Sequence, residues 1–195
     1  MNILERSINY SKRVHDSINS VDPDQLEKAY ELIKNTHLSS ASIYVCGNGG
    51  SLSISEHFYC DHSKGALFDT GSRTFIEPLT SGPMITAIAN DIGYEDIFSY
   101  QLKMKIGSFD TLVVISASGN SPNIIKALNT AKDFGAKSIA FVGFDGGKAK
   151  EIADVVLHCK EDNYGIIEDS HQALMHILAQ QFRMDHLKTG HEIKL

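Results

Sequence analysis

Five short apolar runs dominate the hydrophobic pattern of this chain. They cover residues 42–46, 84–89, 111–116, 138–143 and 155–159. Most of them are continuous rather than alternating, which is typical of parallel strands buried on both faces of a sheet. The helical stretches between most of these runs lie near residues 51–64, 95–106, 121–134 and 146–153. This alternation predicts a doubly wound α/β fold with a five-stranded parallel sheet.

Two helices are predicted before the first strand. Residues 2–19 carry apolar side chains at a roughly helical period. Asp22 and Pro23 are typical of an N-cap and a first helical residue, and Gln25 suggests a capping box for a helix that reaches about residue 37. The apolar face of this pair packs either on its own sheet or on a partner subunit, and the pattern fits both.

The domain organisation predicted from the sequence is simple. A long helix from about residue 167 to 186 closes the chain, and no internal repeat or flexible linker divides it. At 195 residues the chain is long enough for one sizeable core. We therefore expect one domain over residues 1–195, with a helical pair at 1–37 and an α/β core with its closing helix at 38–195.

Two turns rich in glycine and serine follow predicted strands. The first is Gly-Asn-Gly-Gly-Ser at 47–51, and the second is Ser-Ala-Ser-Gly-Asn-Ser at 116–121. Glycine lets the backbone approach a ligand, while serine hydroxyls and helix N-termini bind anions. Together the turns predict a phosphate-bearing ligand at the carboxyl ends of the strands. The candidate binding residues are Asn48, Gly49, Gly50, Ser51, Ser116, Ser118 and Ser121.

Each turn also has a purely structural interpretation. Ser121 could serve only as the N-cap of a helix that starts with Pro122, and Gly119 could serve only to turn the chain. The segment 47–51 matches neither the dinucleotide fingerprint nor the nucleoside triphosphate loop. The first turn is a weak signal alone and becomes informative when paired with the second.

Two helices carry carboxylates and imidazoles at helical spacing. His57 and Asp61 are i, i+4 on one helix, and Glu168 and His176 nearly share a face of the closing helix, with Gln172 between them. Such residues could form a metal site or an acid/base pair. They could equally be surface groups that only stabilise their helices weakly. The neighbouring residues Glu56 and His62 are expected to face solvent.

Composition and charge exclude several classes of protein. With 42% hydrophobic and 22% charged residues the chain is neither disordered nor a disulfide scaffold. A net charge of −6 gives no general attraction to nucleic acid. The cysteines Cys46, Cys60 and Cys159 are odd in number and are expected to be free thiols in a reducing compartment. Without a signal-like start or a long apolar run, we expect a cytoplasmic protein and no membrane span.

Four segments of the chain form a distinctive combination. Two are the glycine and serine turns at 47–51 and 116–121. The others are Ala-Asn-Asp-Ile-Gly-Tyr-Glu-Asp-Ile-Phe at 89–98 and Ser-His-Gln-Ala-Leu-Met-His-Ile-Leu at 170–178. Together they resemble the phosphoheptose isomerases of the sugar isomerase (SIS) superfamily. The serine turn occurs throughout the superfamily, whereas the combination is far more specific. The resemblance covers nearly the whole chain, including the N-terminal helices.

The resemblance implies a three-layer, flavodoxin-like SIS fold with helices on both faces of the sheet. It implies a homotetramer whose active sites lie between subunits, and a sugar phosphate as the bound small molecule. Asp61 falls on the position of a proposed general base and His176 on that of a proposed acid, with Glu168 as a second candidate base. The positions of the zinc and catalytic cluster fall on His57, Asp61, Glu168 and His176. The phosphate- and sugar-binding positions fall on Ser51, Ser116, Ser118, Ser121, Asn48 and Asp91.

The chain departs from the family pattern near this cluster. Asp61 is shorter than the usual glutamate, Glu168 stands where glutamine is usual, and Ala117 replaces a threonine. The implied function is aldose–ketose isomerisation of sedoheptulose 7-phosphate to D-glycero-D-manno-heptose 7-phosphate, for nucleotide-activated heptose biosynthesis. The alternatives are isomerisation of another sugar phosphate, or a non-catalytic SIS protein that binds a replication initiator.

Overall fold

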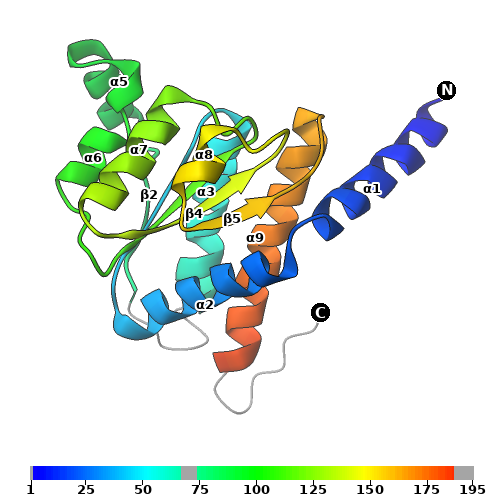
Figure 1. Cartoon of the computed structure of the whole chain (residues 1–195), viewed down its shortest axis with the longest axis horizontal. Coiled ribbons are helices and arrows are strands. Elements are labelled where there is room, and N and C mark those ends of the chain that lie inside the picture. Colours follow the sequence, from blue (N-terminus) through cyan, green and yellow to red (C-terminus); the bar gives the residue numbers. More distant parts are fainter. Residues whose placement is uncertain (1, 67–73, 187–195) are drawn as a thin grey trace.

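A parallel sheet of five strands forms the centre of the computed structural model, which describes residues 2–66 and 74–186 (Figure 1). The strands are β1 (Ile43–Gly47), β2 (Ile76–Pro78), β3 (Thr111–Ser116), β4 (Lys137–Val142) and β5 (Val155–His158). Their order is β2-β1-β3-β4-β5, and every neighbouring pair is parallel. The predicted α/β fold with a five-stranded parallel sheet is confirmed.

Helices cover both faces of this sheet. One face carries α2 (Pro23–Ser39), α3 (Gly50–Cys60) and α9 (Tyr164–His186). The other carries α5 (Gly82–Asp91), α6 (Ser99–Lys103), α7 (Pro122–Asp133) and α8 (Gly147–Ile152). Successive strand residues point to opposite faces, so Val113 lies in one core and Val114 in the other, both 0% exposed. None of the helices in the described ranges is long and apolar enough to cross a bilayer.

One predicted strand is wrong. Residues 84–89 lie within helix α5, and the strand at that side of the sheet is instead β2, only three residues long. Gly82 and Pro83 open the helix, where the missing N–H of proline is tolerated. A short apolar run cannot be assigned to helix or strand by periodicity alone. Within this run only Ile88 is buried, which is inconsistent with a strand covered on both faces.

Two other predicted helices have different limits. The helix expected near 95–106 is divided into a short 3-10 turn, η2 (Tyr94–Asp96), and α6. The helix expected over 51–64 is α3 followed by a π-helical segment, η1 (Asp61–Ala66). This wider segment continues directly from the last turn of α3, so Asp61 lies where the α-helix gives way to the π-helix.

The predicted start of α2 is confirmed, although its capping box is not. The Asp22 side chain accepts a hydrogen bond from the Asp24 N–H at 2.9 Å, and Pro23 is the first helical residue. The Gln25 side chain instead accepts a hydrogen bond from the backbone N–H of Val156 on β5 at 2.9 Å. A side chain of α2 therefore satisfies a backbone donor of the outermost strand.

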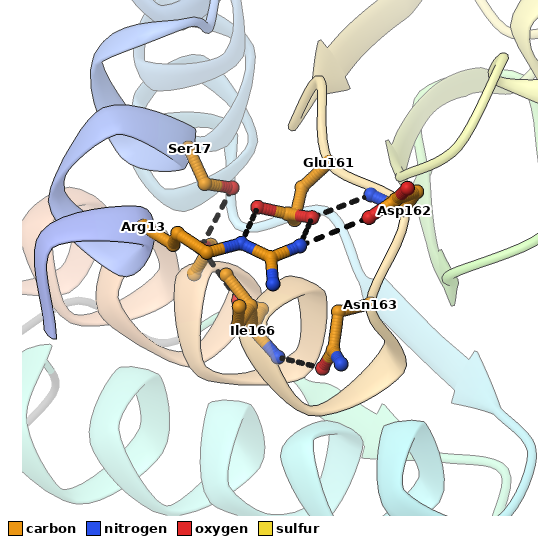
Figure 2. Close-up of polar contacts among 7 residues, drawn as sticks. Arg13, Ser17, Glu161, Asp162, Asn163 and Ile166 are labelled. Carbon is orange, nitrogen blue, oxygen red and sulfur yellow. Dashed lines mark hydrogen bonds and ion pairs between the residues drawn. The ribbon is translucent and has the colours of Figure 1, made fainter. Parts of the chain in front are cut away.

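The first helix, α1 (Ile3–Asn19), is anchored near its C-terminal end. Arg13 forms salt bridges with Glu161 and Asp162 in the loop between β5 and α9 (Figure 2). The hydrogen bonds from Arg13 lower the pKa of the Glu161 carboxyl. One turn further along, the Ser170 hydroxyl of α9 donates to the Ser17 hydroxyl at 2.9 Å. These contacts join α1 to the start of α9.

The N-terminal turns of α1 project away from the sheet (Figure 1). The last anchor on this side is Tyr10, whose hydroxyl donates to Asp169 at 2.6 Å. Before it, Ile3, Leu4 and Ile8 are 81%, 67% and 63% exposed. An apolar surface of this kind is typical of a helix that packs on another subunit.

Candidate active site

The turn after β3 is held tightly against the turn after β4. Gly119 has a φ of +62°, and an added Cβ would lie 2.1 Å from the Gly146 carbonyl oxygen. Within the turn, the Gly119 N–H donates to the Ser116 hydroxyl at 3.2 Å and the Asn120 N–H donates to the Ser118 hydroxyl at 3.3 Å. Both hydroxyls act as acceptors here, so their own protons are free to be donated to an anion.

Ser121 stands at the N-cap position of α7, as predicted, with Pro122 directly after it. Its side chain makes no capping hydrogen bond, while its backbone carbonyl accepts from the Ile124 N–H at 3.0 Å. The interpretation of its hydroxyl as a cap is therefore wrong. The hydroxyl is available to a ligand that also meets the N–H groups at the start of α7.

The turn after β1 leads into α3. Gly49 is the N-cap with a φ of +56°, which favours glycine, and Ser51 in the first turn is 4% exposed. Gly50 faces a carboxylate, because an added Cβ there would lie 2.5 Å from Glu168 Oε2. The structure thus places Glu168 beside the first turn of α3, where the helix dipole favours negative charge.

Asn48 connects this turn to its neighbours. Its amide exchanges two hydrogen bonds of 2.9 Å with the amide of Asn123 on α7, and its Oδ1 accepts from the Tyr94 hydroxyl at 3.1 Å. Asp91, the remaining predicted sugar-binding residue, is exposed at the end of α5 and accepts a hydrogen bond from Asn90 at 2.8 Å. Asn48 therefore contacts α7 through Asn123 and the η2 segment through Tyr94.

His57, Asp61 and His176 come together where α3 meets α9. The two imidazole Nε2 atoms lie 3.4 Å apart, and each lies 3.4 Å from an oxygen of Asp61. The Gln172 amide nitrogen lies 3.0 Å from His57 Nδ1 and 3.2 Å from His176 Nε2. All three ionisable side chains are partly exposed, so the group faces solvent from one side.

The spacing of this group is that of a possible metal-binding site. A tetrahedral zinc site with bonds of about 2.0–2.1 Å separates neighbouring ligand atoms by about 3.4 Å. The two imidazole nitrogens have that spacing, while each lies 3.4 Å from a different oxygen of Asp61, and one ligand atom from each residue lies within 4.8 Å of the other two. Imidazole nitrogen with carboxylate oxygen is a ligand set that zinc accepts. Within the described part of the chain, the ligand atoms that gather closely enough for one ion come from these three residues, and Glu168 is not among them.

His62 lies behind this group and not in solvent, so the expectation of a solvated side chain is wrong. It is 0% exposed and stacks on Phe58 with ring centroids 4.0 Å apart. His37 of α2 lies on its other side, with ring nitrogens 3.3 Å apart. Burial lowers the pKa of both imidazoles, that of His37 to about 4. The i, i+4 spacing from the apolar Phe58 was the available sequence signal.

The cysteines are free thiols, as predicted. Cys46 and Cys159 are buried, and burial raises the pKa of the Cys159 thiol to about 11, so both are core residues. Cys60 is exposed and lines a cavity of about 240 Å³ together with Asp61 and Arg183. The cavity adjoins the His57–Asp61–His176 group through the shared Asp61.

Sequence reasoning missed the amide contacts of the site. Asn123 is the second residue of α7, directly after Ser121 and Pro122, and it is 2% exposed although polar. A polar residue in the first turn of a helix that starts at a ligand-binding turn was the available signal. Tyr94 and Gln172 lie within segments that the resemblance already covered, but their contacts depend on tertiary structure.

The parallel sheet with glycine- and serine-rich turns at its carboxyl ends defines a class, the SIS domain proteins, and the SIS domain family matches residues 8–143. A phosphoheptose isomerase of Helicobacter pylori is 36% identical over 80% of this chain and 81% of its own length. The chain belongs to the phosphoheptose isomerase family.

Solved structures agree with this assignment. A phosphoheptose isomerase from Neisseria gonorrhoeae superposes with a TM-score of 0.83 at 28% identity, over 93% of this chain and 99% of the other. One from Francisella tularensis superposes with a TM-score of 0.84 at 26% identity, over 94% of this chain and 100% of the other. The similarity therefore extends over nearly all of both molecules.

Proposed function

We propose that this protein isomerises sedoheptulose 7-phosphate to D-glycero-D-manno-heptose 7-phosphate, a precursor for nucleotide-activated heptose. The observation that carries the proposal is the convergence of His57, Asp61 and His176 on two helices. Family membership supplies the class of substrate and reaction. The retained acid, base and ligand groups favour an enzyme over a non-catalytic SIS protein.

The two turns would hold the phosphate. The hydroxyls of Ser51, Ser116, Ser118 and Ser121 donate to its oxygens, and the N-termini of α3 and α7 add favourable dipoles. Gly49 and Gly50 allow the close approach, while Asn48 and Asp91 bind sugar hydroxyls. Binding at this remote end positions the reacting C1–C2 unit and so contributes to the rate.

A zinc ion would be held by His57, Asp61 and His176, whose spacing suits it. When bound, it would polarise the substrate carbonyl and stabilise negative charge on oxygen. Asp61 turns both carboxylate oxygens toward imidazoles, each at 3.4 Å. Glu168 belongs to the ligand set implied by the resemblance, yet its carboxylate lies against Gly50. We therefore assign Asp61 to the metal and leave Glu168 free for another role.

The isomerisation needs a base at carbon and an acid at oxygen. Glu168 takes the proton from carbon in our assignment, with Asp61 as the alternative base when no metal is held. His176 delivers and removes protons at oxygen. An imidazole nitrogen that ligates zinc carries no transferable proton. His176 therefore cannot ligate the metal and act as the acid through the same nitrogen at the same time. Activity with and without metal separates them.

The proposed assembly is a cytoplasmic homotetramer of single-domain chains with active sites between subunits. The exposed apolar turns at the start of α1 support it, because Ile3, Leu4 and Ile8 project away from the chain's own sheet. Burying such side chains in a partner contributes roughly 25 cal/mol for each Å² of apolar surface.

The decisive experiment is incubation of the purified protein with sedoheptulose 7-phosphate, with added zinc and after chelation. We expect the heptose 7-phosphate to form, as followed by NMR of the anomeric protons. If only a different sugar phosphate is turned over, that sugar phosphate replaces sedoheptulose 7-phosphate as the proposed substrate. No turnover of any sugar phosphate, together with tight binding to a protein partner, would favour the non-catalytic alternative.

A further inference from the structure

Two asparagine side chains bridge the turns that follow β1 and β3. Asn48 Nδ2 donates to Asn123 Oδ1 and Asn123 Nδ2 donates to Asn48 Oδ1, both at 2.9 Å. Asn123 is the second residue of α7 and only 2% exposed. A buried amide with both polar atoms engaged by one partner holds that partner in a single orientation.

The sheet alone does not hold the two turns at a fixed separation. Backbone pairing between β1 and β3 ends at Gly47 and Ile115, and both turns continue beyond it. Gly49 is exposed, and no neighbouring atom lies within 4 Å of the place where its Cβ would be. Packing is therefore loose around Gly49, and the amide pair is a direct side-chain link between the first turn and the start of α7.

The same pair determines what Asn48 can offer a ligand. Its Oδ1 accepts from both Asn123 and Tyr94, and one of its two Nδ2 hydrogens is donated to Asn123. The second Nδ2 hydrogen is the remaining donor. Its direction is set by the amide plane, which the contacts with Asn123 and Tyr94 define.

We propose that Asn123 is a positioning residue of the substrate site. It orients the Asn48 amide and thereby holds the two anion-binding turns at the separation that one phosphate ester needs. The identity of the ester rests on the proposed function, whereas the coupling of the turns does not. Asn123 itself needs no contact with substrate, because it acts through Asn48.

The test compares Asn123→Leu and Asn123→Ala with a matched control, Asn129→Leu, on the exposed side of the same helix. Misplacement of a binding group by about 1 Å can reduce kcat/KM about 100-fold. We expect KM for sedoheptulose 7-phosphate to rise by about 10- to 100-fold in both Asn123 variants while kcat changes by less than about 3-fold. The control should match the native protein in both constants.

A second arm distinguishes positioning from general support of the fold. In an Asn48→Ala background, Asn123→Ala should change KM by less than about 2-fold, since residues that act as one unit are non-additive. The proposal would be overturned if Asn123→Ala raised KM in the Asn48→Ala background as much as it does in the native background. A lower melting temperature with an unchanged KM would overturn it as well.

Binding of inorganic phosphate, measured by calorimetry, keeps this test separate from the reaction. If the native protein binds phosphate but turns over no heptose phosphate, the proposed function fails and the coupling is still tested. We then expect the phosphate Kd to rise at least about 10-fold in Asn123→Ala and not in Asn129→Leu. Equal phosphate affinity in all variants, or none in the native protein, would refute the coupling.

Discussion

At the scale of single residues, the proposed chemistry depends on the group His57, Asp61 and His176, together with Glu168 as the assigned base. The Nε2 atoms of His57 and His176 lie 3.4 Å apart, and each lies 3.4 Å from a different oxygen of Asp61. His57 lies on α3 and Asp61 at the start of the π-helical segment η1, whereas His176 lies on α9, more than a hundred residues later. The site therefore exists only in the folded chain, and changes at these positions should affect chemistry more than stability.

Replacing His176 with alanine tests this directly. We expect turnover to fall by about 100- to 10,000-fold, the range that removal of a general acid–base group produces. The circular dichroism spectrum and melting temperature should change little, because the side chain is 36% exposed. His15→Ala, at an exposed position of α1, is the control. Near-native turnover in His176→Ala would contradict the assigned role.

A buried histidine on the same helix should make stability depend on pH. His171 is 0% exposed and packs edge-on against Phe141, and burial lowers its pKa to about 4. Its ordinary pKa is about 6.5, so between pH 6.5 and 4 the unfolded chain binds the extra proton. The free energy of unfolding should fall as pH falls through this range, by up to about 1.4 kcal/mol per pH unit from this group, and level off below it.

His171→Leu isolates that contribution. Urea unfolding between pH 7 and 4 should show a shallower loss of stability in this variant than in the native protein, since one neutral buried imidazole is gone. His15→Gln, which changes an exposed imidazole, should follow the native curve. Parallel curves for His171→Leu and the native protein would show that His171 does not titrate in this range.

At the scale of elements, the turns at the carboxyl ends of the strands are interlocked. The turn after β3 approaches the turn after β4 so closely that Gly119 has no room for a side chain. The turn after β1 is joined to α7 through Asn48 and Asn123. The two proposed anion-binding turns are thus in contact with neighbouring segments, and a backbone change in one of them should alter phosphate affinity.

Gly119→Ala is the corresponding prediction. Its φ of +62° disfavours any side chain, and the added Cβ would meet the Gly146 carbonyl oxygen at 2.1 Å. We expect the free energy of unfolding to fall by at least about 2 kcal/mol, and phosphate affinity to fall with it. Gly82→Ala, where nothing lies within 4 Å and φ is not positive, should be nearly neutral. A stable Gly119→Ala variant with native affinity would disprove the interlocking.

The sequence predicted most elements because most were strongly patterned. Continuous apolar runs such as 111–116 gave strands, and Asp22 with Pro23 gave a helix start. The run at 84–89 failed because six apolar or small residues fit a helix as well as a strand, and β2 is too short to leave a clear pattern. Of the site, the turns and the His57–Asp61 pair were visible locally. The place of Glu168 against Gly50 was not, since it depends on how α9 crosses α3.

At the scale of the whole molecule, α1 is divided between two environments. Its later turns are tied to the chain's own fold by Tyr10 and Arg13, whereas the apolar side chains of its first turns are mostly exposed. This division lets the helix keep its position while it offers an apolar surface to another chain. Assembly and folding should therefore be separable by mutation.

Changing Ile3, Leu4 and Ile8 together to serine should weaken assembly and leave the chain folded. We expect sedimentation of this variant to shift toward smaller species, because burial of these side chains contributes roughly 1.5–3 kcal/mol each. A triple change of Asn9, Lys12 and Asp16, exposed polar residues on the opposite side of α1, to alanine is the control. Unaltered sedimentation of the apolar variant would exclude α1 from the interface.

The two outer strands of the sheet restrict how copies of this protein can associate. On one side β2 is three residues long and ends in Pro78, and on the other side Gln25 occupies a backbone donor of β5. Short or proline-ended outer strands are poor templates for strand addition by another chain. These features disfavour strand addition at both outer strands, which leaves the helical surfaces for ordered association.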